Sequence, residues 1–276
     1  MIFSDQKNHE KRQPAVAGRF YPAEREALVR EVEAHIDRDA KKSRALGIVA
    51  PHAGFMYSGD VAGAVYSRIE IPDTVILIGP NHTGQGEEVA VMTEGTWSMP
   101  MGDISIDREM AHAICEETSI AKQDSTAHQH EHSLETQLPF LQYFKKEFQI
   151  VPICLRRMKV ASCKVLSEGI VRAVTRLDKP VLLVASSDMT HYESHDQAGT
   201  KDRMAIACMQ SRDPVGLFET VRSEKITMCG VNPVTVMLYC SESLGAKEAE
   251  LVKYMTSGEV SGDMEQVVGY AGMIIK

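Results

Sequence analysis

The sequence predicts an α/β fold in which a mostly parallel central sheet is flanked by helices. Three short apolar, β-branched runs support this prediction, because each has the length of a buried strand and helical patterns separate them. They span residues 46–50, 74–79 and 180–187, and each leads within a few residues to a histidine. Ligands bind at the carboxyl ends of the strands in open α/β sheets. The three segments therefore predict one site assembled at one edge of the sheet.

Length and composition are those of an ordinary globular protein, with 276 residues, 43% hydrophobic and 25% charged. We expect one domain over residues 1–276, with residues 1–13 as a loose lead-in. The net charge of −8 argues against affinity for nucleic acid or an anionic membrane surface. No apolar run approaches the roughly 20 residues of a membrane-spanning helix. With no signal-peptide pattern, and six cysteines that form no CxxC pair, a cytoplasmic protein with free thiols is expected.

The other elements follow from hydrophobic periodicity and from capping residues. A helix over residues 60–68 joins the first two strands, which are expected to be neighbours in a right-handed βαβ unit. Asp107 is expected to cap one helix, and Asn232 followed by Pro233 another. Further helices are expected at 23–39, 107–117, from 132 or 133 onward, at 162–177 (with Val165, Ile170 and Val174 inward), 195–210, 213–222 and 232–244. Further strands are expected at 87–93, 103–106, 149–155, 249–256 and 267–275.

His52 and His82 each follow a buried strand directly, beside a proline and close to a glycine. Either one alone would be interpreted as a hydrogen-bonded loop histidine. Two in the same context favour metal ligands or an acid–base pair, because imidazole is the commonest protein metal ligand and titrates near neutral pH.

Cys229 precedes a predicted helix N-terminus, where the helix dipole is expected to lower the pKa of a thiol and favour a metal-binding thiolate. The alternative for Cys229 is a small buried apolar residue. Asp188 is a metal ligand, a partner that orients an imidazole, or a turn residue. His191 has the spacing of a general acid/base. Ser186 and Ser187 raise a hydrolase alternative, which the absence of a G-x-S-x-G motif disfavours.

The alternation of His128, His130 and His132 suggests a metal site, but a solvated loop explains it better. Within this stretch only His132 and Glu135, at the start of a predicted helix, are expected to face the site. The sequence contains no HExxH motif and no phosphate-binding loop.

Several motifs together resemble the Memo family, whose prokaryotic members are called AmmeMemoRadiSam system protein B. The similarity runs from about residue 14 to the C-terminus. The motifs are PAVAGRFYP at 14–22, APHAG at 50–54, YSG at 57–59, GPNH at 79–82, EHSLE at 131–135, SDMTHY at 187–192 and CG at 229–230.

The resemblance implies a fold similar to class III extradiol dioxygenases of the protocatechuate 4,5-dioxygenase β-subunit type. It implies a metal site of His52, His82 and Cys229 with Asp188 nearby, and His191 as the acid/base. Tyr57, Asn81, His132 and Glu135 are then expected to contact a substrate. Those dioxygenases bind Fe(II) through two histidines and a glutamate, so Cys229 is a departure, and extradiol cleavage does not carry over.

The resulting hypothesis is a redox metalloenzyme with iron or copper, acting on an unknown small molecule. The alternatives are a non-catalytic module that binds a metal or a peptide, and a zinc-type hydrolase. The family resemblance also implies AMMECR-type and radical SAM partner proteins.

Overall fold

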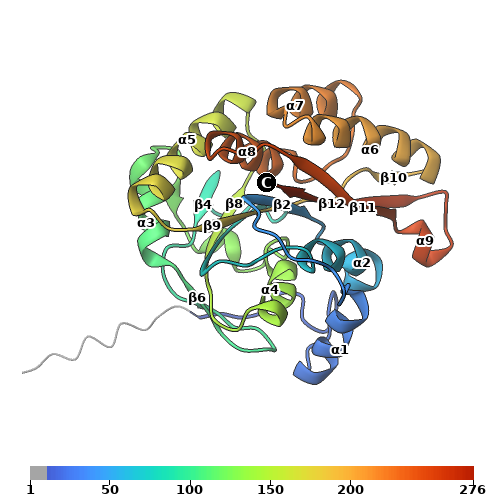
Figure 1. The fold of residues 1–276 in the computed structure, drawn as a ribbon, viewed down its shortest axis with the longest axis horizontal. Helices are drawn as coiled ribbons and strands as arrows, with labels where there is room; N and C mark the ends of the chain where they lie inside the picture. Colours follow the sequence, from blue (N-terminus) through green and yellow to red (C-terminus); the bar gives the residue numbers. More distant parts are fainter. Residues whose placement is uncertain (1–10) are drawn as a thin grey trace, which may run out of the picture.

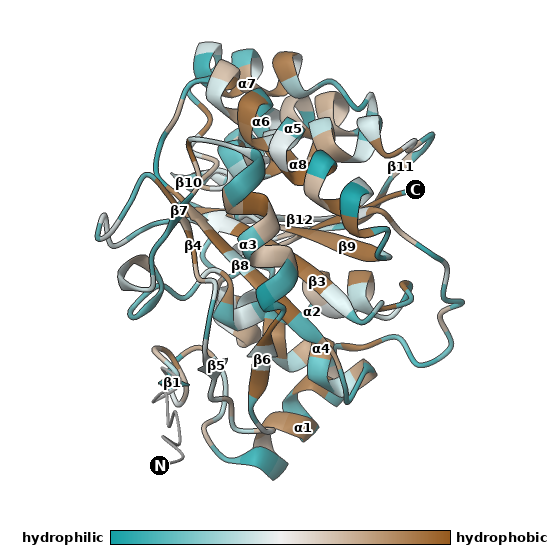
Figure 2. Ribbon diagram, turned by 90° about the vertical axis from the view of Figure 1, so that its left-hand side faces the viewer, coloured by the Kyte–Doolittle hydropathy of each residue, from teal (hydrophilic) through white to brown (hydrophobic). Residues whose placement is uncertain are grey.

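The computed structural model describes residues 11–276, which form a twelve-stranded, mostly parallel sheet with helices on both faces (Figure 1). The fold class expected from the sequence is confirmed. Four parallel strands occupy the middle of the sheet in the order β8 (Gln149–Leu155), β3 (Thr74–Pro80), β9 (Val181–Ser186) and β2 (Gly47–Ala50). These strands are buried on both faces, which explains their continuous apolar runs, and Figure 2 shows β8, β3 and β9 as apolar bands.

The order of these strands corrects one expectation. β2 and β3 were expected to be neighbours, but β9 lies between them, pairing Val184 with Ile48 on one side and with Leu77 on the other. The chain moves from β2 to β3 through α2 (Phe55–Tyr66) and returns from β8 to β9 through α5 (Val160–Leu177). The carboxyl ends of β3, β9 and β2 are therefore adjacent at one edge.

Shorter and antiparallel strands extend the sheet on both sides. Beyond β2 lie β12 (Val267–Ile275), β11 (Ala249–Thr256) and β10 (His191–Glu193). Beside β8 lie β6 (Ile104–Ile106), β5 (Thr96–Trp97), β1 (Lys11–Arg12), β4 (Val89–Val91) and β7 (Lys122–Gln123). Strands β1, β5, β7 and β10 have two or three residues each, too few to show a pattern in the sequence.

The helices form two layers. One face carries α1 (Arg25–His35), α2 and α4 (Leu138–Phe144). The other carries α3 (Arg108–Glu117), α5, α6 (His195–Gln210), α7 (Pro214–Ser223) and α8 (Val231–Ser243). The remaining helical segments are the short α9 (Gly258–Ser261) and the 3₁₀ turns η1 (Thr126–His128) and η2 (Glu135–Gln137).

Several local expectations differ from the structure. Gly230, not Asn232, precedes the first helical residue of α8, and the Asn232 side chain instead binds the backbone of Met158. Val165 is 42% exposed rather than inward. The helix expected from residue 132 or 133 begins only at Leu138, after a 3₁₀ turn.

The expectation of a loose segment at residues 1–13 is wrong for Arg12. Its side chain is fully buried, and its guanidinium lies 3.9 Å from the Trp97 ring centre. Residues 1–10 lie outside the described residues.

Asp107 caps α3 as expected, accepting a hydrogen bond from the Met110 amide. Burial alone would raise the pKa of Asp107, but bonds from Met110 and Thr74 and the charge of Lys179 lower it below its usual value. An acid whose pKa is lowered by folding stabilises the protein above its unfolded-state pKa of about 3.9, and that stabilisation is lost as pH falls through the folded-state pKa.

We therefore predict that Asp107→Asn lowers the free energy of unfolding by roughly 1 kcal/mol at neutral pH, because the charge-assisted bonds are lost. The difference from wild type should shrink as pH falls below about 4, the unfolded-state pKa, toward the lowered folded-state pKa of Asp107. Denaturant unfolding between pH 7 and 3 measures it, with the exposed Asp39→Asn as control. A deficit that does not change with pH would contradict this role.

Candidate functional site

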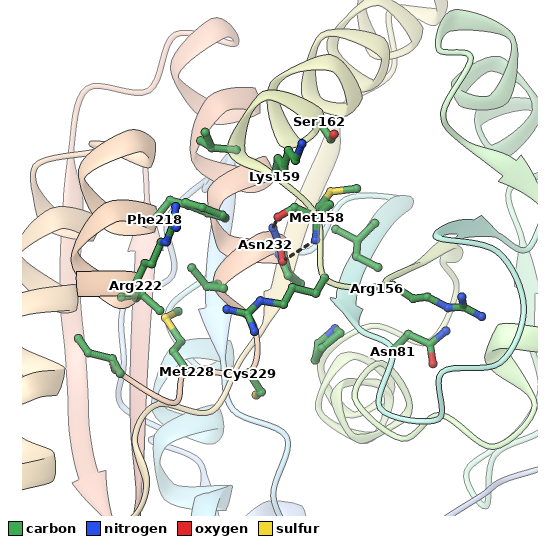
Figure 3. Close-up of a pocket in the computed structure, with 18 of the residues that line it drawn as sticks. Asn81, Arg156, Met158, Lys159, Ser162, Phe218, Arg222, Met228, Cys229 and Asn232 are labelled. Carbon is green, nitrogen blue, oxygen red and sulfur yellow. Dashed lines mark hydrogen bonds between the residues drawn. The ribbon is translucent and has the colours of Figure 1, made fainter. Parts of the chain in front are cut away.

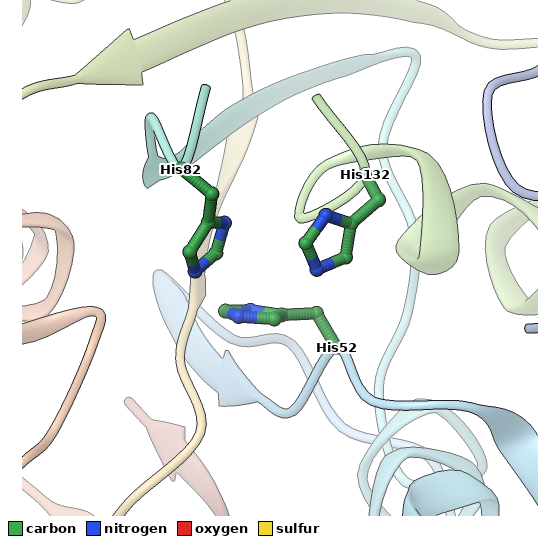
Figure 4. Close-up of side chains that lie close together, drawn as sticks. All are labelled: His52, His82 and His132. Carbon is green, nitrogen blue, oxygen red and sulfur yellow. The ribbon is translucent and has the colours of Figure 1, made fainter. Parts of the chain in front are cut away.

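Three histidines converge at the carboxyl edge of the parallel strands (Figure 4). His52 follows β2, His82 follows β3, and His132 lies in the loop before α4. Each offers one ring nitrogen to a group whose atoms lie within 4.8 Å of one another. The rings of His82 and His132 stack with centroids 4.7 Å apart, and the His52 ring lies nearly perpendicular to both.

The hydrogen bonds behind His52 determine which of its nitrogens carries the proton. The Ser186 hydroxyl donates to the Ser133 carbonyl (2.7 Å) and accepts from the Gln137 amide (2.9 Å). Its one proton is thus already committed when it meets His52 Nδ1 at 2.8 Å. His52 Nδ1–H must therefore donate to Ser186, and Nε2 carries the lone pair.

His82 is oriented in the same way, by a carboxylate. Its Nδ1 lies 2.9 Å from Glu131 Oε1, and its backbone amide donates to Glu131 Oε2. An ionised carboxylate only accepts, so Nδ1 carries the proton and Nε2 has the free lone pair. Burial alone would lower the pKa of His82, but Glu131 more than offsets this and raises it.

Glu131 also fixes the loop that carries His132. The same carboxylate accepts the backbone amides of His132 and Ser133, both at 2.9 Å. Burial would raise the pKa of Glu131, but His82 and these amides lower it to about 2. Burial lowers the pKa of His132 by more than the Glu131 charge raises it. The Glu131 carboxylate is thus ionised at neutral pH and buried beside three imidazoles.

Cys229 and Asp188 lie next to His52. The Cys229 sulfur is 3.3 Å from His52 Nε2, and the Asp188 amide donates to that sulfur over the same distance. Asp188 Oδ1 accepts the His52 backbone amide at 2.8 Å, and its Oδ2 lies 3.9 Å from His52 Nε2. Gly230 permits this approach, because a Cβ there would lie 2.3 Å from Ser187 Cβ.

The expected lowering of the thiol pKa is wrong for the protein chain alone. Burial raises the pKa of Cys229 well above its usual value, and the charge of Asp188 raises it further. Burial likewise raises the pKa of Asp188. A cation bound by these donors would lower both pKa values, since a coordinated thiol loses its proton.

His191 is held by the backbone on its Nδ1 side. This nitrogen lies 2.8 Å from the Met189 carbonyl and 3.0 Å from the Thr227 carbonyl, and carbonyls only accept. Nδ1 therefore carries the proton, and Nε2 is available as a base. His191 is close enough that its charge acts on His52 and Asp188.

The residues expected to contact substrate lie in different environments. Asn81 lines a pocket beside His82, but its side chain is engaged in a turn with Thr83 and Gly84. Tyr57 is partly exposed at the start of α2. Glu135 is fully buried and pairs with Arg12 at 2.7 Å, so a substrate contact does not fit its position. His132, expected as a substrate contact, belongs to the three-histidine group itself.

His128 differs from the solvated loop expected for residues 128–132. It is fully buried, with Nδ1 3.3 Å from the Cys154 sulfur, and burial lowers its pKa to about 4. His130 is exposed, as expected. The orienting roles of Ser186, Gln137 and Glu131 could not be predicted from the sequence, because hydrogen bonds between distant residues leave no local pattern.

Fold and site together define an α/β protein whose central parallel strands carry a histidine cluster, supported by a carboxylate and a serine, at their carboxyl edge. The family model described as "Memo-like protein" matches residues 12–274. The chain belongs to the Memo family.

Curated relatives match it over nearly their whole length. A MEMO1 family protein of Methanopyrus kandleri is 42% identical and covers 96% of this chain and 99% of its own. One of Methanosarcina barkeri is 43% identical over 96% of this chain and 100% of its own. Among solved structures, an uncharacterized protein from Escherichia coli K12 shares the fold, with a TM-score of 0.53 and 10% identity over 84% of this chain and all of its own.

Within residues 11–276, no helix is long and apolar enough to cross a membrane. All six cysteines are free.

Glu131→Gln is predicted to lower the pKa of His82 in the metal-free protein, because the burial that disfavours the imidazolium stays and the balancing charge is gone. NMR titration of the imidazole resonances measures it. Glu94→Gln, which alters an exposed glutamate near His112, serves as the matched control. An unchanged His82 titration in Glu131→Gln would refute the assignment of Glu131 as its orienting partner.

Proposed function

We propose that this protein binds iron or copper through His52, His82 and Cys229, and that it acts as a redox metalloenzyme on a small substrate. Asp188, 3.9 Å from His52 Nε2, and His132, grouped with His52 and His82, are further donors. His191 moves protons to and from the substrate.

The paired orientation of His52 and His82 supports the metal site most directly. In both rings Nδ1–H is bound to an oxygen behind it, Ser186 Oγ or Glu131 Oε1, so that Nε2 is the nitrogen with the lone pair. Metal-ligating histidines nearly always donate their second N–H to a carboxylate, a carbonyl or another oxygen, which fixes the tautomer. A loop histidine with a purely structural role needs no such shared arrangement.

The donor set fits a transition metal. Two imidazoles and a thiolate form a softer site than two imidazoles and a carboxylate, and such sites take Cu(I), Fe(II) or Zn(II). An iron or copper ion bound there would supply one-electron redox chemistry. The likeness to extradiol dioxygenases extends to the expected fold and to the two histidines, while Cys229 stands in place of their glutamate.

The protein groups around the donors have defined tasks in this proposal. His191 keeps a proton on Nδ1 through two backbone carbonyls, so that Nε2 accepts a proton from a substrate and later returns it. Asp188 holds the His52 backbone, and the Thr227 hydroxyl holds the His191 amide at 2.6 Å. The buried serines do not fit a nucleophile, because Ser186 and Ser187 are fully buried and hydrogen-bonded.

A zinc-type hydrolase is the second candidate, and the His52, His82 and His132 group favours it. Three neutral imidazoles with an open fourth position are a known donor set of catalytic zinc. The hydrolase hypothesis makes His132 the third ligand and predicts a metal without redox activity. The third candidate function is a non-catalytic module that binds a metal or a peptide. AMMECR-type and radical SAM partners stay a prediction from the family resemblance.

Metal analysis of protein purified without oxygen or chelator tests the site. We expect near-stoichiometric iron or copper in the wild type and its loss in His52→Ala and Cys229→Ser. His130→Ala and Cys208→Ser are matched controls, since these residues lie outside the cluster. Metal kept in Cys229→Ser but lost in His132→Ala would favour the zinc reading. Unchanged metal content in His52→Ala would overturn the assignment.

His191→Gln is predicted to leave metal content unchanged and to lower kcat by about 10²- to 10⁴-fold, the usual contribution of a general acid/base. Oxygen uptake by metal-loaded protein, screened against small carboxylates and phosphates, provides the assay. His195→Gln is the control in a neighbouring segment. Absence of turnover with every compound, together with a full complement of metal, would favour the non-catalytic module.

A further inference from the structure

A large pocket adjoins the histidine cluster at His82, and Figure 3 shows its lining. It has a volume of about 1370 Å³ and is lined by His82 and Cys229. Its walls come from the β8–α5 loop and from the segment between α7 and α8. Its size exceeds the roughly 300–1,000 Å³ typical of small-molecule sites. A ligand in this pocket has room to reach both the cluster and the outer walls.

The pocket walls are strongly cationic. One carboxylate side chain, Glu88, lines the pocket, against five cationic side chains: Arg156, Arg157, Lys159, Arg222 and Lys225. This balance is opposite to that of the whole chain, whose net charge is −8. A local reversal of sign in an acidic protein marks this pocket out from the rest of its surface.

Four of these cations are free to bind a ligand. Arg156 is engaged, because its guanidinium donates to the carbonyls of Gly84 and Gly86 and so holds the loop after His82. The other four form no ion pair and no side-chain hydrogen bond to any residue in 11–276. Elsewhere in the protein many surface lysines and arginines are paired, for example Arg172 and Arg176 with Glu117.

Two helices add to the positive potential. The first turns of α5 and α8 both line the pocket, at residues 160–162 and 231–233. Neither helix has a side-chain hydrogen bond at its N-cap. Helix N-termini carry a partial positive charge.

We propose that the pocket binds a small organic anion, with its carboxylate or phosphate group among Arg157, Lys159, Arg222 and Lys225 and its other end at His82 and Cys229. The proposal thus gives the substrate class of the metal site proposed above. The interpretation of the bound anion as a substrate rests on that proposed function. Arginine pairs with both oxyanions through parallel N–H bonds, and lysine adds a mobile charge. Figure 3 shows Arg222 and Lys159 on different walls, so an anion can be held from two sides.

Calorimetry with inorganic phosphate and with succinate tests the pocket on metal-free protein. The titrations use an ionic strength of about 0.01 M, where the Debye length is about 30 Å. The test variant is Lys159→Gln with Arg222→Gln. The matched control is Lys41→Gln with Arg30→Gln, which removes the same charges from exposed positions outside the pocket. Thermal unfolding confirms that both variants fold, and the shift in unfolding temperature with each anion provides a second binding readout.

We expect the test variant to bind at least one anion about tenfold more weakly than the control variant, since each charged hydrogen bond contributes on that scale. Binding of phosphate alone would assign a phosphate ester, and binding of succinate alone a carboxylate. Equal affinities in the two variants, or no binding of either anion by either readout, would overturn the proposal.

Metal analysis of separate samples, purified without oxygen or chelator, separates the two proposals. Anion binding without a metal would leave the pocket assignment standing and refute the metalloenzyme. Metal binding without anion binding would refute the anion pocket and leave the metal site standing.

Discussion

The carboxylate of Glu131 is the constraint on which the site depends. It accepts hydrogen bonds from the His82 ring and backbone and from the amides of His132 and Ser133. The loop around it has little regular structure, so its backbone amides need side-chain acceptors. One buried charge thus fixes two histidines on separate segments. Its burial is tolerable because every partner is a donor.

A second buried charge holds that loop from behind. Arg12 donates to the carbonyls of His128 and Glu131 and pairs with Glu135, while Glu135 also accepts from Tyr21 and from the amides of Ala15 and Val16. The N-terminal segment is thereby tied to the residues that carry His132. Breaking such a pair leaves an uncompensated buried charge and typically costs about 3–5 kcal/mol. The segment of motif residues 14–22 therefore serves to position the cluster.

The sequence predicted the central strands and the convergence of His52, His82, Asp188 and His191, because buried strands leave continuous apolar runs and parallel strands end at a common edge. It could not predict that β9 separates β2 from β3, since the order of strands depends on packing between distant segments. The tautomer of His52 depends on Ser186, Ser133 and Gln137, none of which is near it in sequence. Arg12 was missed because a lone arginine in a polar stretch has no pattern that distinguishes it from a solvated one.

The insertion of β9 between β2 and β3 has a consequence for how the molecule forms. His52 and His82 follow strands that do not pair with each other, and the strand between them, β9, comes about a hundred residues after β3 in the chain. Cys229 meets His52 across 177 residues. Contacts of such long sequence separation form late, since loop closure must precede them. In a chain emerging from the ribosome, β9 and Cys229 are made long after His52 and His82, so we expect the complete site to assemble only when the fold is nearly complete.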